Sequence, residues 1–166
     1  MNNNNMTDIY TFLDTNNITY ERFDHPAAFT CEQAMEVCPA MPGASIKNLF
    51  LYDKRTDQHF LVVVGKEKQV DLKQLKFILD VSNLSFASEE RLQKYLGVTP
   101  GSVTILGLIN DTTRAVTVIF DINLKDKTLQ CHPLVNTATL AIPFEDIKKF
   151  LSITQHDYQF LDIPTR

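Results

Sequence analysis

Cysteine is scarce in this chain, and its spacing excludes the frameworks that cysteines usually build. The 166 residues contain three, Cys31, Cys38 and Cys131, and no two of them form a C-x-x-C pair. An odd number without that spacing argues against both a disulfide framework and a zinc site. We therefore expect free thiols in a reducing cytoplasm.

Long hydrophobic runs and a basic N-terminal region are also missing. No segment is long and apolar enough to span a membrane, and the asparagine-rich start lacks both the basic and the apolar parts of a signal peptide. We expect residues 1–6 to form a disordered polar tail. We also expect a cytoplasmic protein that makes no contact with a membrane.

Basic residues are in a slight minority, with 16 Lys and Arg against 20 Asp and Glu and a formal net charge of -4. This balance argues against a broad phosphate-binding surface, and hence against a DNA-binding protein, because affinity for a duplex grows with the number of phosphates neutralised. A small local basic site can still hold one RNA end.

Familiar catalytic signatures are absent as well. The chain has no H-E-x-x-H, no G-x-x-x-x-G-K-S/T, no G-x-G-x-x-G after a strand and no G-x-S-x-G. The four histidines lack ligand spacing, and His59 and His156 fit solvated positions. His25 and His132 each precede a proline, which favours extended backbone from which a side chain can be aimed. For both, a purely structural role is the alternative.

Apolar periodicity, caps and turns predict a mixed order of elements. The order does not alternate strictly between strand and helix, so the sequence favours one α+β domain over 7–166, with a mixed sheet surrounded by helices. The predicted elements are a helix capped by Thr7, a strand over 18–23, a short helix from Thr30, strands over 49–52 and 60–64, a helix capped by Asp71 with its apolar stripe over 72–79 in the core, a strand over 84–87, a helix over 89–96, a loop over 98–111, strands over 115–121, 128–131 and 138–142, and a helix opened by Pro143.

Three segments point together to a binding pocket. Lys47 is a cationic residue at the mouth of an apolar run that is typical of a buried strand. The glycine loop over 101–104 suits a close approach of backbone to a ligand. The third segment is 132–139, which begins with His132. Together they predict a pocket for an anionic, hydrolysable ester. Taken alone, Lys47 would be a solvated flank of a strand.

In their order and spacing, several blocks of this chain resemble the YbaK/prolyl-tRNA-synthetase-associated domain family. The resemblance covers about residues 10–156 and is strongest to its free-standing members, the ProXp-ala or PrdX group. It implies the barrel-like, mostly antiparallel fold of a prolyl-tRNA synthetase editing domain. The blocks that carry it are His25-Pro26-Ala27, Lys47-Asn48-Leu49-Phe50-Leu51, Leu84 to Ser88, Leu96 to Val103, Gly107 to Asp111 and His132 to Thr139.

The resemblance implies hydrolysis of the ester that joins a wrong amino acid, most simply alanine, to proline tRNA. Lys47 corresponds to the lysine needed for activity, and we expect it to anchor the phosphate or terminal-nucleotide end. Gly101 corresponds to a loop glycine whose backbone amides can stabilise an oxyanion. His132 is expected to orient the aminoacyl end. Further contacts are expected from His25, Asn48, Ser102, Val103, Ile105, Asn136 and Thr137.

The resemblance further implies that no cofactor or metal takes part, because the substrate's own ribose hydroxyl and a water would carry the reaction. The expected partners are the acceptor end of mischarged tRNA and, as a second candidate, prolyl-tRNA synthetase. One position departs from the family loop G-x-x-x-P, because Ile105 stands where proline is usual. This puts the accepted amino acid in question, with serine and cysteine as alternatives to alanine.

Two other functions remain open at this point. A pocket without a visible base can belong to a non-catalytic module that recognises aminoacylated tRNA ends or a synthetase. A hydrolase that uses Cys31 or Cys131 as its nucleophile is a weaker alternative, because no neighbouring residue is expected to lower the pKa of either thiol.

Overall fold

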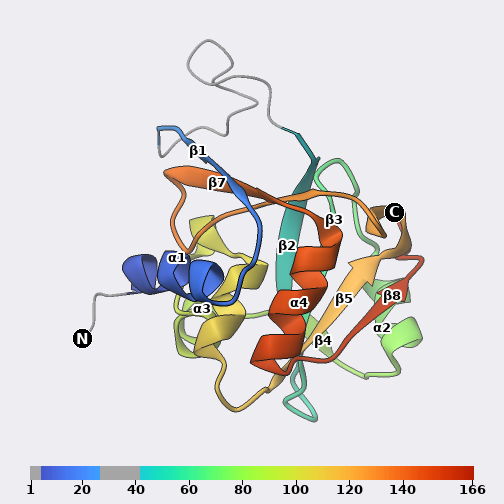
Figure 1. The fold of residues 1–166 in the computed structure, drawn as a ribbon. Helices are drawn as coiled ribbons and strands as arrows, with labels where there is room; N and C mark the ends of the chain where they lie inside the picture. The colour runs from blue at the N-terminus through green and yellow to red at the C-terminus, as the bar shows by residue number, and fades with distance from the viewer. Residues whose placement is uncertain (1–4, 27–41) are drawn as a thin grey trace.

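The structure is a computed structural model that describes residues 5–26 and 42–166, with side chains from Ile9 onward (Figure 1). Its elements are α1 (Asn5–Thr15), β1 (Glu21–Asp24), β2 (Ala44–Asp53), β3 (His59–Gly65), α2 (Leu72–Leu79), β4 (Leu84–Phe86), α3 (Glu89–Leu96), the short 3-10 helices η1 (Pro100–Ser102) and η2 (Ile105–Asn110), β5 (Val116–Asp121), a third 3-10 turn η3 (Ile122–Leu124), β6 (Leu129–Cys131), β7 (Ala138–Ile142), α4 (Phe144–Thr154) and β8 (Tyr158–Leu161).

The strands form one mixed sheet in the order β1-β7-β6-β2-β3-β5-β8, with β4 paired to β2. Four pairings are antiparallel and three, β2–β6, β3–β5 and β5–β8, are parallel. In Figure 1, β1 and β7 run across the molecule while β2, β3, β5 and β8 run along it, so the sheet is strongly curved. The predicted mixed, mostly antiparallel α+β fold is confirmed, although β1 and β8 lie at opposite ends of an open path.

The sheet separates two apolar clusters, and β3 shows why its sequence is an unbroken apolar run. Leu61 and Val63 belong to the larger cluster, which includes residues of α1, α3 and α4. Phe60, Val62 and Val64 belong to the smaller cluster, on the side of α2. A strand covered on both faces needs apolar residues at successive positions rather than at alternate ones.

Local capping chemistry fixes two of the helices where the sequence predicted them. The Asp71 side chain accepts hydrogen bonds from the Lys73 and Gln74 amides at 3.1 and 3.2 Å, and α2 follows. Ser88 accepts from the Arg91 amide at the start of α3, and Gly97 ends that helix in the left-handed conformation. These signals act within a few residues, so they can be seen in the sequence.

Other expectations were wrong in detail. The helix α1 begins at Asn5, so Thr7 lies within it and is not its cap. β2 begins at Ala44 and therefore contains Lys47, which is not at its mouth. Ile78 is 48% exposed because α2 packs through Leu75, so the predicted core stripe is narrower. The strand β8 was not predicted at all.

Some expectations lie outside what the structure describes. The short helix predicted from Thr30 falls in 27–41, and of the predicted tail over 1–6 only Asn5 and Met6 are described, as the start of α1. Among the described helices, none has the length and apolar character needed to cross a membrane.

Candidate active site

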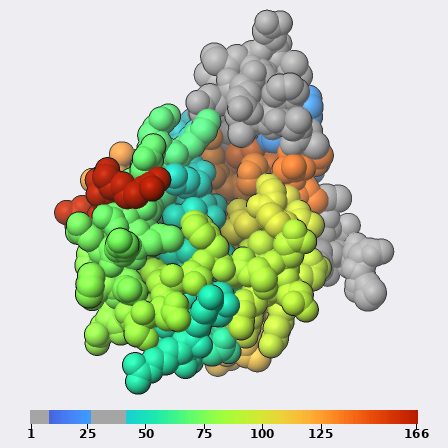
Figure 2. Space-filling view, turned by 180° about the vertical axis from the view of Figure 1, so that it is seen from behind, coloured from blue at the N-terminus to red at the C-terminus, as the bar shows by residue number. Residues whose placement is uncertain are grey.

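The middle of β2 has one open edge. β2 pairs with β3 from Ile46 to Tyr52, but its other edge pairs with β6 only at Ala44–Ser45 and with β4 only at 51–53. Between these pairings no described strand covers it. Figure 2 shows β2, in teal, in a recess between the green segment that contains α2 and the yellow segment that contains η1.

Lys47 and Asn48 flank this open edge from opposite faces of the sheet, because successive residues of a strand alternate. Lys47 shares its face with Leu49 and lines a cavity on the side of α2. Asn48 shares its face with Ile46 and Phe50, on the side of the larger cluster. Its Oδ1 atom is buried and has no hydrogen-bond partner in the described parts of the chain.

The glycine loop forms the 3-10 turn η1, followed by Val103. The Ser102 amide donates to the Thr99 carbonyl at 2.9 Å and is therefore occupied. The Gly101 amide has no acceptor among residues 5–26 and 42–166, whereas the Val103 amide closes the last turn of η1 toward the Pro100 carbonyl. Gly101 is exposed, and a Cβ built on it would lie 3.9 Å from Asn136 Nδ2. The loop thus presents the free Gly101 amide beside the segment that follows His132.

Thr104 fixes this loop to the His132 segment. Its Oγ1 donates to the His132 carbonyl at 2.6 Å and accepts from the Leu106 amide at 3.2 Å, and the residue is fully buried. Ile105, the departure from the family loop, is also fully buried in the larger cluster. It has no surface for a substrate to touch in this structure, so it acts on the loop through packing alone.

His132 is held in one tautomer by its surroundings. Its Nδ1 lies 3.3 Å from the Ala138 carbonyl, which can only accept, so Nδ1 carries the proton and Nε2 is left as an acceptor. Burial lowers the pKa of His132; the Ala138 hydrogen bond opposes this shift, and charge on His25 adds to it. The ring is therefore neutral near pH 7.

His25 is the second histidine of this corner. Its Nδ1 donates to the Pro26 carbonyl at 3.0 Å, so its Nε2 accepts from the Thr139 hydroxyl at 2.8 Å. The His25 amide donates to the Thr137 carbonyl, which continues the pairing of β1 with β7. Both ring nitrogens are used within the protein, so His25 positions the His132 segment. Thr137 itself is exposed.

The structure thus brings together most of the predicted site residues. One group forms around the glycine loop and the segment after His132: His25, Gly101, Ser102, Val103, His132, Asn136 and Thr137. Lys47 stands apart from this group, across the open edge of β2. Sequence reasoning missed the role of Thr104, whose partner is 28 residues away, a distance over which no local pattern gives a signal.

Cys131 is unsuited to a nucleophilic role. It is buried, and burial raises the pKa of its thiol to about 12, so the thiolate is scarce near neutral pH. Cys31, the other thiol considered, lies outside the described residues. Within those residues, no group of His, Cys, Asp and Glu side chains is arranged to hold a metal ion.

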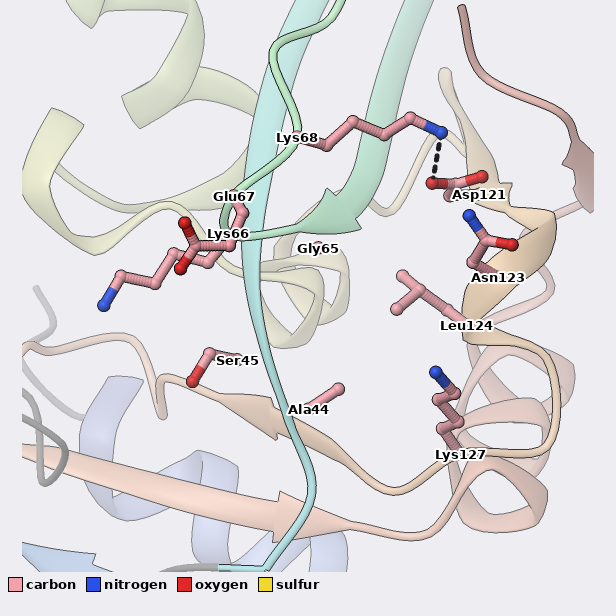
Figure 3. Close-up of a pocket in the computed structure, with 10 residues that line it drawn as sticks. All are labelled: Ala44, Ser45, Gly65, Lys66, Glu67, Lys68, Asp121, Asn123, Leu124 and Lys127. Carbon is pink, nitrogen blue, oxygen red and sulfur yellow. Dashed lines mark hydrogen bonds and ion pairs between the residues drawn. The ribbon is translucent and has the colours of Figure 1, made fainter. Parts of the chain in front are cut away.

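A second cavity, shown in Figure 3, contains none of the predicted site residues. The Lys68 ammonium lies 2.6 Å from Asp121 Oδ2 across this cavity, and both side chains are largely buried. Figure 3 shows this pair joining the loop that follows β3 to the end of β5. We interpret the pair as a structural link between the two parallel strands.

A known protein family matches most of this chain. Residues 25–150 match the family model described as an aminoacyl-tRNA editing domain. The chain belongs to this family. The matched range contains every predicted site residue, from His25 to Thr137.

Two relatives and one solved structure are similar over 80% or more of their own length. The prolyl-tRNA editing protein ProX of Acetoanaerobium sticklandii is 37% identical over 91% of this chain and 93% of its own. The prolyl-tRNA synthetase associated domain-containing protein 1 of Danio rerio is 38% identical over 87% of this chain and 80% of its own. A crystal structure proposed to be a trans-editing enzyme for prolyl tRNA synthetase shares the fold, with a TM-score of 0.72, 18% identity and full coverage (100%) of both chains.

Proposed function

We propose that this protein hydrolyses aminoacyl-tRNA in trans, removing alanine from mischarged proline tRNA. The observation that carries the proposal is the free Gly101 amide, on a loop that Thr104 ties to the segment of the neutral His132. The membership of the editing family and the similarity to ProX support the reaction class and the tRNA. The products would be the free amino acid and intact tRNA.

The arrangement can catalyse ester hydrolysis without a side-chain nucleophile. Water attacks the ester carbonyl carbon, the carbonyl oxygen becomes an oxyanion, and the Gly101 amide donates to it. Collapse of this intermediate breaks the bond to the ribose oxygen, which takes a proton and leaves as the hydroxyl. The adjacent ribose hydroxyl of the substrate orients the water, so no base from the protein is required.

Lys47 and His132 bind the substrate on either side of the scissile ester, at the terminal nucleotide and at the amino acid. The Lys47 ammonium makes no ion pair with a described residue, which leaves it free to hold a phosphate of the terminal nucleotide. The Nε2 atom of His132 accepts a hydrogen bond from the amino group of the substrate. Asn48 Oδ1, buried and without a partner, is a second acceptor at the open edge of β2.

Editing of this kind supplies discrimination that a hydrophobic synthetic site cannot provide for amino acids of similar size. The partner is the acceptor end of tRNA, with prolyl-tRNA synthetase as the enzyme whose errors are corrected. The reaction places the protein in the cytoplasm, where tRNA is charged. Ile105 packs into the core and leaves the amino acid pocket to other residues, so alanine is the first substrate to test.

A deacylation panel tests the proposal. Proline tRNA charged with alanine, serine, cysteine or proline is incubated with wild type, Lys47→Ala and the control Lys127→Ala, which alters the cavity of Figure 3 instead. We expect selective loss of alanine and about a 10- to 100-fold slower reaction for Lys47→Ala, the effect of removing one charged hydrogen bond. Lys127→Ala should match wild type.

The outcomes separate the candidate functions. Full activity of Lys47→Ala would refute its role as an anchor. Binding of charged tRNA without hydrolysis across the panel would make the protein a recognition module. Selective release of serine or cysteine would keep the reaction and change the substrate.

A further inference from the structure

The cavity that Lys47 lines is rich in cationic side chains. It has a volume of about 640 Å³, within the range of small-ligand sites, and lies where β2, the start of α2, β4 and the segment ending at Arg166 meet. In Figure 2 the red segment and the green segment border this side of the recess. Three cationic side chains line it: Lys47, Lys73 and Arg166.

The cations of this cavity are not neutralised by the protein. None of the three forms an ion pair within the described parts of the chain. Asp71 is the single acidic residue among those that line the cavity, and its Oδ1 accepts the amides of Lys73 and Gln74 at the start of α2. A protein with net charge -4 thus keeps a local excess of positive charge here.

An exposed aromatic ring stands beside these cations. Phe86, the last residue of β4, is 60% exposed and lines the same cavity. Exposure of so large an apolar side chain has a cost that burial of a ligand would recover. Aromatic rings next to a cationic groove are the arrangement that binds single-stranded nucleic acid, because bases stack on the ring while cations hold the phosphates.

We propose that this cavity binds the unpaired nucleotides that precede the aminoacylated end of the RNA. One base stacks on Phe86, and backbone phosphates lie against Lys73 and Arg166. Lys47 lines the cavity at the open edge of β2, so it joins this RNA path to the site of hydrolysis. The direction of the strand rests on the proposed function, whereas binding of an unpaired RNA end does not.

The proposal is tested by binding of two uncharged RNA hairpins, one with an unpaired 3′ strand and one blunt, followed by fluorescence anisotropy. Phe86→Ala is compared with Phe77→Ala, a ring that is 77% exposed but lies outside this cavity. Lys73→Ala is compared with Lys76→Ala, whose ammonium lies over the Phe77 ring. Each pair matches residue type, and Lys73 and Lys76 also share α2.

We expect Phe86→Ala to weaken binding of the hairpin with the unpaired strand about tenfold and to leave binding of the blunt hairpin unchanged. Lys73→Ala should reduce the salt dependence of binding by about 0.7 in the log–log slope, the value for one phosphate contact on a single strand. Both control variants should bind as wild type does. With charged tRNA, Phe86→Ala should raise KM and leave kcat near wild type.

Two results would overturn the proposal: unchanged binding by Phe86→Ala, or equal losses for both hairpins. If wild type still hydrolyses charged tRNA, neither result would contradict the proposed function. Conversely, Phe86-dependent binding of the unpaired strand by a protein that hydrolyses no charged tRNA would refute the proposed function and leave this RNA site standing.

Discussion

Buried polar groups are hydrogen-bonded around Asp111 and His156, but one at the open edge of β2 is not. His156 Nε2 lies 3.0 Å from Asp111 Oδ2, and its Nδ1 lies 2.9 Å from the Thr154 hydroxyl. Asp111 also accepts from the Val116 amide and the Thr113 hydroxyl. At β2, by contrast, Asn48 Oδ1 is buried and unpartnered. The satisfied groups of the first region hold elements together, whereas the unsatisfied Asn48 oxygen remains available to a ligand.

The electrostatics of the first region follow from its partners. Burial favours the neutral form of Asp111, but hydrogen bonds from His156 and from the Val116 and Ala115 amides outweigh it and hold the pKa of Asp111 below its ordinary value. The carboxylate is therefore charged in the folded protein and depends on these donors. They join the end of η2 to β5 and to the end of α4.

The largest expected effect sharpens this contrast. His156→Ala leaves the buried Asp111 Oδ2 without its imidazole partner, so we expect a loss of about 3–5 kcal/mol in the free energy of unfolding. Urea denaturation measures it. The control Lys148→Ala removes an exposed ion pair with Glu145 and should leave the midpoint unchanged. Equal midpoints for both variants would show that the buried pair does not anchor the fold.

Two glycines show a similar contrast, because Gly107 is tightly packed whereas Gly101 has open space around it. A Cβ at Gly107 would lie 2.9 Å from the Leu96 carbonyl oxygen and 3.0 Å from Leu96 Cβ, so Gly107→Ala should cost about 1–3 kcal/mol through overpacking. Gly101→Ala meets only Asn136 at 3.9 Å, so its stability should stay within about 0.5 kcal/mol of wild type. Thermal unfolding of both variants tests the difference, and deacylation by Gly101→Ala shows whether a substrate needs the space.

A substitution at Asn48 is expected to stabilise the fold, whereas those above destabilise it. Because its Oδ1 is buried without a partner, Asn48→Leu should raise the free energy of unfolding by about 1 kcal/mol while slowing deacylation. Urea denaturation and the deacylation rate are measured on the same preparation. A variant that loses stability would show that Asn48 supports the fold, and one that keeps full activity would remove it from the site.

The smallest expected effect is a pH dependence. The pKa of His132 lies below 6.5, so protonation costs the folded protein, and activity should fall as pH decreases from 6.5 through the folded-state value because Nε2 stops accepting. His59 also has a pKa lowered by burial, so stability falls over the same range for two reasons. His132→Gln should flatten the activity profile, and an unchanged profile would return His132 to a structural role.

Much of the fold could be predicted, and the limit lies in the range of the signals. The strand over 138–142 and the helix over 89–96 have the predicted bounds. The strand β8 was missed because its four residues carry only a partial apolar pattern, and it is defined by parallel pairing with β5. Ile78 was assigned to the core by its helical position alone, and only the packing of α2 shows it exposed.

The sequence by itself determined the family, the capped helices and the identity of the loop and histidine segments, because caps and motif blocks act through neighbours a few residues away. Tertiary structure decided which of those residues meet. The His25–Thr139 bond spans 114 residues, Thr104 ties the loop to His132, and alternation in β2 sends Lys47 and Asn48 to opposite faces. Such contacts depend on strand pairing and packing, which no local pattern encodes.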